Sequence, residues 1–230
     1  MGVTAEGMTI EVARELVSNQ LLWPLVRAFL WDFAPSIHAS WLDGLQVPGL
    51  VHDFVRSEVQ RPNPSPRVKR YILDSLGVEP CFHTFPKEDF SRILLLDGAT
   101  LESVAKWLGA LACAGGLRRV TDGATVRKLK ASLSGVYPEV FGYTMYFNLA
   151  VKGAESAKTP EDIVAIGFKM LFSQFADLPE SLVARLKFKL PKSLCELCVP
   201  CGKAKSVVSG SVVSKLLKLK FPEAYNLCCS

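Results

Sequence analysis

Cysteine is the residue type whose spacing in this sequence comes closest to that of a chemical site. Cys195, Cys198 and Cys201 follow one another at three-residue intervals, and Cys228 and Cys229 stand near the end of the chain. Zinc takes four tetrahedral thiolate or imidazole ligands, which two close pairs usually supply. Three cysteines at these intervals can equally lie along one side of a helix as small apolar residues. Both interpretations stay open, and we favour the helical one with no bound metal.

The histidines and the paired acids do not complete an enzyme site. His38, His52 and His83 have no metal-ligand spacing to one another. Glu88-Asp89 and Glu161-Asp162 stand at expected helix starts, where the helix dipole stabilises negative charge. The sequence also lacks the glycine-rich phosphate loops, the nucleophile elbow, the zinc-protease pair and the EF-hand loop. We therefore predict a protein that is not an enzyme, with no catalytic residue, no cofactor and no small-molecule substrate.

Length and composition are those of a globular protein. The 230 residues are 49% hydrophobic and 21% charged, enough to bury one substantial core. Seven cysteines are too few for a disulfide scaffold, in which roughly 8–10% of residues are cysteine. The longest uncharged apolar run, Trp107 to Leu117, falls short of the about 20 residues that span a bilayer. These features favour a soluble protein from a reducing compartment.

The apolar residues recur with helical periodicity almost throughout, and no long alternating segment indicates a strand. We predict an all-α fold: an irregular multi-helix globular domain over residues 1–190, with a Pro-rich loop at 61–67. A basic, Cys-containing helical extension over 191–230 follows and packs on this main domain. The predicted helices cover Ile10–Val17, Leu21–Trp31, Leu50–Val59, Val68–Leu76, Leu101–Ala112, Val126–Leu133, Ile163–Phe175, Pro179–Lys189, Lys192–Cys198 and Ser211–Leu219. Pro138 opens an aromatic segment over Val140–Leu149.

The helix after residue 100 has the strongest pattern. Leu101, Val104, Leu108 and Leu111 follow at the spacing of one helical face, so we expect this face in the core. Gly115-Gly116 should end or loosen the helix. Other apolar residues are also expected to point inward, among them Val51, Phe54 and Val55 of Leu50–Val59 and at least two of Trp23, Trp31 and Trp41.

Positive charge is concentrated near the C-terminus. Arg185 to Lys220 holds nine basic residues and a single acid, Glu196, whereas residues 1–184 hold 18 basic and 20 acidic residues. Such a stretch can bind an anionic membrane or nucleic acid, and it can also be the solvated face of helices. Eight of the nine are lysines with few aromatic neighbours, which speaks against a nucleic-acid platform. We expect the stretch to tune placement rather than supply the main contact.

Two short elements resemble the SctK family of type III secretion proteins, which includes YscK and PscK. Leu108-Gly109, then Leu117-Arg118-Arg119-Val120 after seven residues, preceded by Ile93-Leu-Leu-Leu96, is similar to the middle of that family. Phe33-Ala34-Pro35 resembles its early Phe-x-Pro element, although His38 and Ser40 stand where the family usually has a Tyr and a His. The resemblance runs from Phe33 to Phe147 and does not extend beyond Lys192.

Family membership would imply a cytosolic adaptor at the cytoplasmic face of the bacterial inner membrane. SctK proteins connect the inner-membrane ring protein SctD to the SctQ pod of the sorting platform, and the pod links through SctL to the ATPase. The resemblance thus implies SctD-like, SctQ-like and SctL-like partners and no catalysis. An alternative is a peripheral binder of anionic membrane or nucleic acid through the Lys-rich stretch, and an enzyme with an unrecognised site is a third. The predicted partner-binding residues are Phe33, Pro35, His38, Trp41, Arg118 and Arg119.

Overall fold

Helices form every regular element that the structure describes. The structure is a computed structural model that describes residues 22–45, 49–59, 61, 64–86, 90–147, 149, 151, 154, 157, 159–198 and 210–229. These residues form α-helices and short 3₁₀ helices and contain no strand, which confirms the predicted all-α fold. The first predicted helix, Ile10–Val17, lies outside the described residues.

The chain divides into two compact units, each with its own core. Unit 1 draws on the described residues of Met1–Asp97, Leu178–Lys192 and Glu223–Ser230. Unit 2 draws on Gly98–Asp177 and Ser193–Pro222. Both units therefore use residues from either side of the boundary predicted after residue 190, and that boundary stays a prediction.

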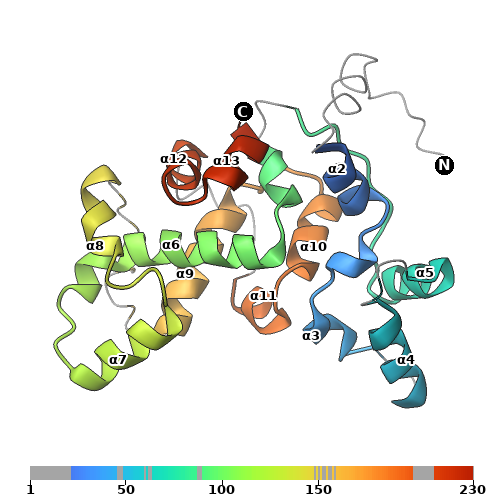
Figure 1. The fold of residues 1–230 in the computed structure, drawn as a ribbon, viewed down its shortest axis with the longest axis horizontal. Helices are drawn as coiled ribbons and strands as arrows, with labels where there is room; N and C mark the ends of the chain where they lie inside the picture. The colour runs from blue at the N-terminus through green and yellow to red at the C-terminus, as the bar shows by residue number, and fades with distance from the viewer. Residues whose placement is uncertain are drawn as a thin grey trace. The chain divides into compact units, whose positions relative to one another are not determined.

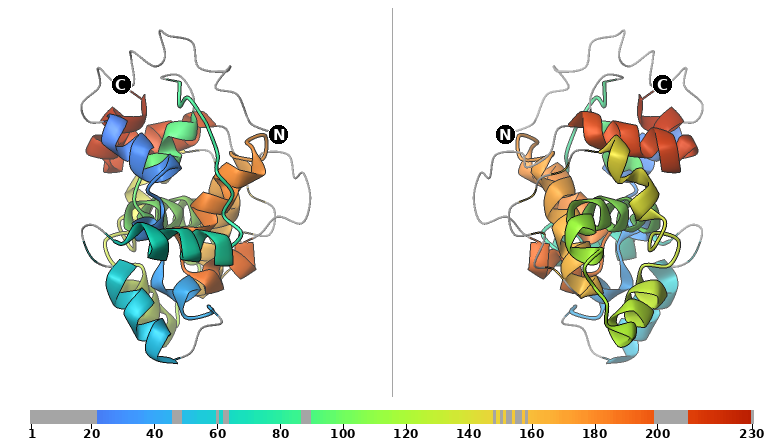
Figure 2. Two further views of the ribbon diagram at one scale, coloured as in Figure 1. Left: turned by 90° about the vertical axis from the view of Figure 1, so that its right-hand side faces the viewer. Right: turned by 90° about the vertical axis from the view of Figure 1, so that its left-hand side faces the viewer.

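Unit 1 is assembled from short helices, which are labelled in Figure 1. They are α2 (Leu22–Leu30), η1 (Ala34–Ser36), α3 (Ala39–Leu42), α4 (Gly49–Val59), α5 (Pro66–Ser75), η2 (Phe90–Leu95), α10 (Glu180–Phe188) and most of α13 (Pro222–Cys229). Helices α4 and α5 are neighbours, as the left view of Figure 2 shows. Pro66 stands in the first turn of α5, where proline is well tolerated, so the helix begins inside the predicted Pro-rich loop.

Unit 2 is built around the long helix α6. Its elements are α6 (Gly98–Leu117), α7 (Gly123–Ser132), α8 (Val140–Tyr143), η3 (Thr144–Tyr146), α9 (Pro160–Ser173), most of α11 (Lys192–Cys198) and α12 (Gly210–Lys220). The expected α6 stripe is confirmed, because Leu101, Val104, Leu108 and Leu111 are all buried. The helix continues through both glycines and ends only at Leu117.

Helices α6 and α9 meet backbone to backbone at a pair of glycines. A Cβ atom on Gly109 would lie 1.9 Å from the carbonyl oxygen of Ile163, and one on Gly167 would lie 1.8 Å from that of Ala105. No other residue type leaves room for such an approach, which is why glycine stands at both positions. The helices α6 and α9 therefore form the structural centre of unit 2.

The start of α9 follows its sequence signal. The Thr159 hydroxyl accepts a hydrogen bond from the Asp162 amide at 3.1 Å, and Pro160 occupies the first turn. Glu161 and Asp162 lie in that turn, where their charge is favourable to the helix dipole. The expectation that Glu161-Asp162 stands at a helix start is thus confirmed, and the helix begins at Pro160, ahead of the predicted Ile163.

Helix α12 is an integral part of unit 2. Val213, Leu216 and Leu217 are each fully buried, and α12 packs on α6. The basic residues of α12 therefore belong to an amphipathic helix whose apolar side is in the core.

Candidate partner-binding surfaces

The early Phe33-Ala34-Pro35 element turns the chain after α2. Phe33 is fully buried, with its ring 5.8 Å from that of Phe29, whereas Pro35 is exposed in η1. Phe33 is thus a core residue in this structure: it can support a binding surface but has no area of its own to offer a partner. Pro35 lies on the surface and fixes the turn beside it.

His38 sets the start of α3. The Ser40 amide donates a hydrogen bond to His38 Nδ1 at 3.2 Å, and Ser40 Oγ lies 2.8 Å from the same nitrogen. The His38 amide donates to the Phe188 carbonyl at 2.8 Å, and Ser40 Oγ accepts from the Lys192 amide at 2.9 Å. His38 and Ser40 therefore dock α3 on the C-terminal end of α10.

Trp41 packs against the same end of α10. Its Nε1 donates to the Leu190 carbonyl at 2.8 Å, and its ring meets the edge of Phe188 at 4.8 Å. The Lys192 ammonium lies 5.8 Å from the centre of the Trp41 ring. Because Trp41 is only half-buried, part of its ring remains open to a partner, as expected of an interface tryptophan.

The expectation that at least two of Trp23, Trp31 and Trp41 are buried was wrong. Trp31 is 51% exposed, and Trp23 and Trp41 are half-buried. Trp31 stands between Trp23, at 5.8 Å between ring centres, and Phe82, at 6.5 Å. Phe82 is itself 40% exposed, so the three rings form an aromatic surface on unit 1 rather than a core. We call Trp23, Trp31 and Phe82 the aromatic surface.

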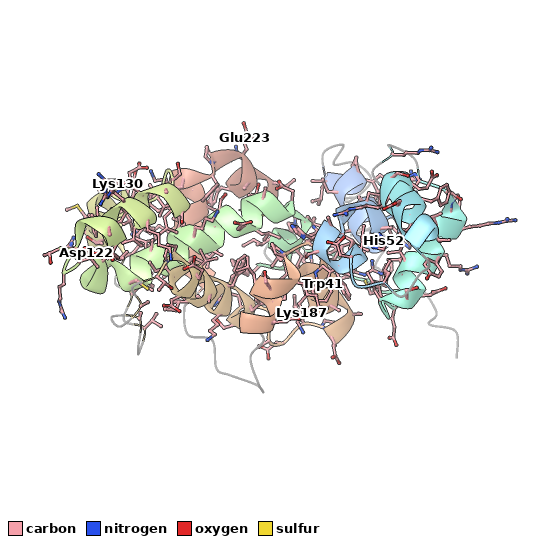
Figure 3. All side chains as sticks on the ribbon, turned by 90° about the horizontal axis from the view of Figure 1, so that it is seen from below. Trp41, His52, Asp122, Lys130, Lys187 and Glu223 are labelled. Atoms are coloured by element: carbon pink, nitrogen blue, oxygen red, sulfur yellow. The ribbon has the colours of Figure 1, made fainter. Side chains whose placement is uncertain are left out.

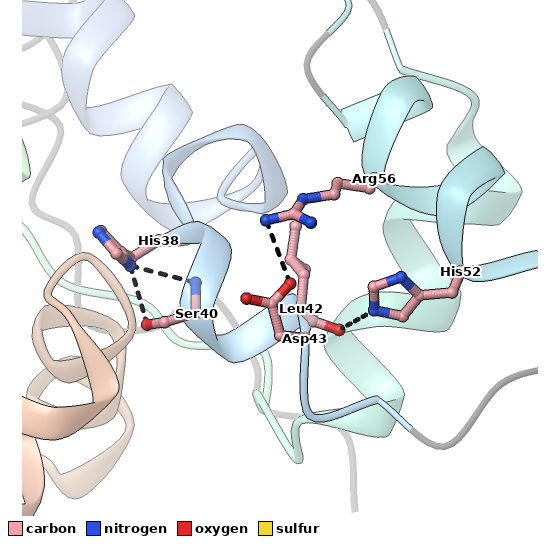
Figure 4. A network of polar contacts seen from close by, with 6 residues as sticks. All are labelled: His38, Ser40, Leu42, Asp43, His52 and Arg56. Atoms are coloured by element: carbon pink, nitrogen blue, oxygen red, sulfur yellow. Dashed lines mark hydrogen bonds and ion pairs between the residues drawn. The ribbon is translucent and has the colours of Figure 1, made fainter. Parts of the chain in front are cut away.

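Helix α4 is joined to α3 by polar contacts, shown in Figure 4. Arg56 pairs with Asp43 at 3.2 Å, and His52 Nε2 contacts the Leu42 carbonyl at 3.0 Å. The prediction that Val51 and Phe54 point inward was wrong, because they are 43% and 54% exposed. Val55 and Val59 are buried, so the later turns of α4 provide the packing against unit 1.

Two cations of the basic stretch are buried in unit 1. Arg185 donates to the Phe29 carbonyl at 3.0 Å and the Glu79 carbonyl at 2.9 Å, and its guanidinium lies 5.2 Å from the Phe33 ring centre. Lys189 Nζ donates to the carbonyls of Leu94 and Leu96 at 2.6 and 2.8 Å. Through these hydrogen bonds, Arg185 and Lys189 connect α10 and the residue after it to neighbouring segments.

Burial lowers the pKa of Lys189 from its ordinary value of 10.5 to about 7, although the nearby Asp97 acts in the opposite direction. The carbonyl oxygens and the Phe29 ring, 4.7 Å from the ammonium, supply the polar contacts that water would otherwise make. A perturbed lysine can mark a catalytic site. Here the contacts of Nζ are backbone carbonyls and an aromatic ring, so its role is structural.

Arg118 lies on unit 2, at the C-terminal end of α6. Its Nη2 donates to Thr144 Oγ1 at 2.7 Å, and the guanidinium stacks over Phe141 at 5.7 Å. The sequence left open whether it pairs with an internal acid or faces a partner; in the structure its bonds are to a hydroxyl and a carbonyl, and the side chain is exposed. These contacts therefore hold the Arg118 side chain in a position where a partner protein can reach it.

Beside Arg118, two apolar side chains stand open to solvent. Met145 is 81% exposed and Tyr146 is 53% exposed, and both belong to the short helix η3, which begins at Thr144. Methionine, tyrosine and arginine are enriched at the centres of protein interfaces. The sequence identified Val140–Leu149 only as an aromatic segment, and nothing in it indicated that these two side chains are exposed. We call Arg118, Met145 and Tyr146 the η3 surface.

The lysines of α12 are engaged within unit 2. Lys220 pairs with Glu139, and its ammonium lies 4.5 Å from the Trp107 ring centre and 4.1 Å from that of Tyr143. Lys215 donates to the Tyr146 carbonyl at 2.9 Å. Together with the burial of Arg185 and Lys189, these contacts leave much of the basic stretch occupied, which speaks against its use as a free phosphate-binding tail.

The cysteine pattern does not gather into a described site. Cys195 and Cys228 are buried, whereas Cys201 and the side chains of Cys198 and Cys229 lie outside the described residues. Within the described part of the chain, no three His, Cys, Asp or Glu side chains are grouped so that they could hold a metal ion. Burial, with Asp162 nearby, raises the pKa of the Cys113 thiol to about 12, which marks an unreactive core residue.

The structure thus sorts the six predicted binding residues by unit. Phe33, Pro35, His38 and Trp41 lie together in unit 1, and Arg118 and Arg119 lie at the end of α6 in unit 2. Their service as binding residues stays a prediction. No helix in the described residues combines the length and apolar character that crossing a membrane requires.

Comparison with known proteins identifies the class. Exposed aromatic and arginine side chains such as Trp31 and Arg118 are of the types enriched at protein interfaces. Residues 28–140, from α2 to the start of α8, match the family described as YOP proteins translocation protein K (YscK). Over these residues the predicted YscK family is confirmed, and the family match indicates a type III secretion protein. No curated protein and no solved structure is significantly similar to it.

Proposed function

We propose that this chain is a non-enzymatic adaptor of a bacterial type III secretion system. It links an SctD-like inner-membrane ring protein to an SctQ-like pod, and through the pod to an SctL-like protein, at the cytoplasmic face of the inner membrane. The family match and the resemblance of Phe33–Phe147 to SctK proteins support this assignment. Recognition then comes from the helical body, and the basic stretch serves mainly internal packing.

One observation carries the proposal: each unit has its own exposed surface of interface-type residues. Unit 1 presents the aromatic surface, with Trp31 51% exposed, and unit 2 presents the η3 surface, with Met145 81% exposed. A protein that joins two others needs two surfaces that do not compete. Large aromatic and methionine side chains gain most from burial at such contacts, at about 25 cal/mol per Å² of apolar area.

The test uses one exposed substitution on each unit. The tagged full chain is mixed with a purified SctD-like cytoplasmic domain and, separately, with an SctQ-like protein, and captured complexes are quantified. Trp31→Asp should lose one partner, and Met145→Asp should lose the other. Each variant serves as the control for the other, because both place a carboxylate at an exposed apolar position.

Circular dichroism first verifies that each variant keeps its helical spectrum. A wild-type chain that captures neither partner would end the adaptor proposal. A folded variant that loses both partners at once would show that the two surfaces do not act separately, which also contradicts it.

A further inference from the structure

Helix α7 and the turn before it carry an unbalanced positive charge. Residues 118–130 contain Arg118, Arg119, Arg127, Lys128 and Lys130 and a single acid, Asp122. All five basic side chains are exposed, and Leu129 is the buried residue of α7. Figure 3 labels Asp122 at the start of the helix and Lys130 nearer its end. We call Arg127, Lys128 and Lys130 the α7 basic surface.

The one acid of this segment is committed to capping α7. Asp122 accepts hydrogen bonds from the Thr125 amide at 2.7 Å, from the Thr125 hydroxyl at 2.6 Å and from the Ala124 amide at 3.4 Å. These bonds lower the pKa of Asp122, so its charge is fixed at the helix start. It offsets part of the positive charge, and a clear excess remains.

Within the described part of the chain, internal carboxylates do not neutralise Arg127, Lys128 and Lys130. The ion pairs of described residues in unit 2 join Lys106 to Glu102 and Lys220 to Glu139. Among the described residues, Arg127, Lys128 and Lys130 pair with no carboxylate, and Arg127 Nε bonds the Gly123 carbonyl. Like charges spaced this closely on a helix are mutually destabilising, so an acidic partner would stabilise the α7 basic surface.

A groove of about 650 Å³ borders this surface. Arg119 and Lys128 lie in its wall with Thr121, Asp122 and Thr125, so the groove offers cations and hydrogen-bonding hydroxyls together. Glu161 and Asp162, in the first turn of α9, are not among the groove's lining residues. A concave site of this size accommodates a polypeptide segment.

The chemistry favours a protein partner over a membrane or a nucleic acid. A membrane-binding helix needs large exposed apolar side chains to insert, whereas in α7 Leu129 is buried and Val126 is half-buried. Single-stranded nucleic acid is held by aromatic stacking, and residues 118–132 include no aromatic residue. Arginine and lysine beside a groove suit the carboxylates of an extended acidic chain.

We propose that the α7 basic surface and its groove dock an extended acidic segment of a partner protein. The carboxylates of that segment pair with Arg127, Lys128 and Lys130. This inference deepens the proposed function, on which it rests, by assigning the chemistry of one partner contact.

A peptide titration tests the inference without any secretion component. The probe is a fluorescein-labelled peptide of alternating glutamate and serine, about ten residues long and about 33 Å when extended. The full-length chain is titrated into the probe, and fluorescence polarisation reports binding at about 50 and about 200 mM salt. A peptide with glutamine in place of glutamate is the uncharged control.

Lys128→Glu should weaken binding of the acidic peptide about tenfold, which corresponds to about 1.4 kcal/mol. Lys128→Gln should have a smaller effect in the same direction. Lys169→Glu is the matched control: Lys169 is exposed on α9 of the same unit and undergoes the same charge change, so it should leave affinity unchanged. Circular dichroism should show native helix in all three.

The inference is overturned if the wild-type chain does not bind the glutamate peptide, or if Lys128→Glu and Lys169→Glu weaken it equally. It is also overturned if single-stranded RNA or anionic vesicles bind more tightly than the peptide and with the same sensitivity to Lys128→Glu. The titration is independent of the capture experiment with SctD-like and SctQ-like proteins. Failure of one is therefore distinguishable from failure of the other.

Discussion

Replacing Gly109 with alanine should severely destabilise unit 2. The added Cβ would lie 1.9 Å from the Ile163 carbonyl oxygen, whereas real Cβ contacts essentially never fall below 3.0 Å. The difference, 3.0 − 1.9, means that α6 and α9 must separate by about 1.1 Å. The obstacle is backbone inside a helix and not the end of a flexible side chain, so local relaxation cannot remove the overlap.

The magnitude follows from what such a separation does to the core. A radial gap of about 0.5–1 Å already forfeits a quarter to a half of the dispersion attraction of the atoms that line it. Ordinary overpacking costs about 1–3 kcal/mol, and this case involves the central helix pair of the unit. We therefore expect Gly109→Ala to lower the free energy of unfolding by about 3 kcal/mol or more.

Gly115→Ala is the matched control on the same helix. A Cβ there meets nothing within 4 Å, and the position is exposed. Alanine should stabilise the helix by about 0.5–1 kcal/mol, because the unfolded chain loses less entropy on folding. Urea unfolding followed by circular dichroism compares the two variants directly.

A third variant checks the geometry itself. Gly167→Ala should be as damaging as Gly109→Ala, and the double variant should cost less than the sum, because both act at one contact. If Gly109→Ala proved as stable as Gly115→Ala within about 0.5 kcal/mol, α6 and α9 would not be this close in solution, and the reasoning would fail.

Four further outcomes follow from the burial and contacts described above. The folded pKa of Lys189, about 7, lies below its unfolded value, so its contribution to stability is complete above pH 10.5 and is lost as the pH falls to about 7. The difference between wild type and Lys189→Met in urea unfolding should rise over that range, and a flat difference would refute the assigned pKa. Lys220→Met should lower the free energy of unfolding by about 1–2 kcal/mol through loss of its ring contacts, whereas Lys130→Met should change it little; equal effects would contradict the packing of α12. Cys113 should resist alkylation in the native protein and react after unfolding, as mapped by mass spectrometry, and rapid native labelling would disprove its burial. Leu108→Asp should unfold the protein, because an unpaired carboxylate in the core costs several kcal/mol, and a folded variant that loses one partner would move Leu108 to an interface.

Local sequence signals were sufficient for most helices. The predicted bounds of α4, α10, α11 and α12 agree with the structure within about two residues, which is the usual ambiguity of helix ends, and α9 begins three residues before its predicted start. These helices have strong apolar periodicity or clear caps, such as Thr159 before α9. Both signals are read from residues within one or two turns, so no tertiary information was needed.

The outward-facing apolar residues could not be predicted in this way. Val51 and Phe54 lie on the same helical stripe as Val55, yet only Val55 is covered. Met145 and Tyr146 belong to an aromatic segment of the sequence, and the structure places them in η3, where they are exposed. Periodicity states which residues share a face, and only the neighbouring segments decide whether that face is buried.

The charged residues show most clearly what the sequence predicts and what the tertiary structure decides. By itself, the sequence determined the all-α class, the main helices and the concentration of basic residues after Arg185. Only the tertiary structure decided that Arg185 and Lys189 are buried on backbone carbonyls, that Lys220 lies against two aromatic rings, and that the cations of α7 stay exposed. The reason is physical: the environment of a charge is set by groups brought from distant parts of the chain, and the spacing of neighbours along the sequence carries no record of them.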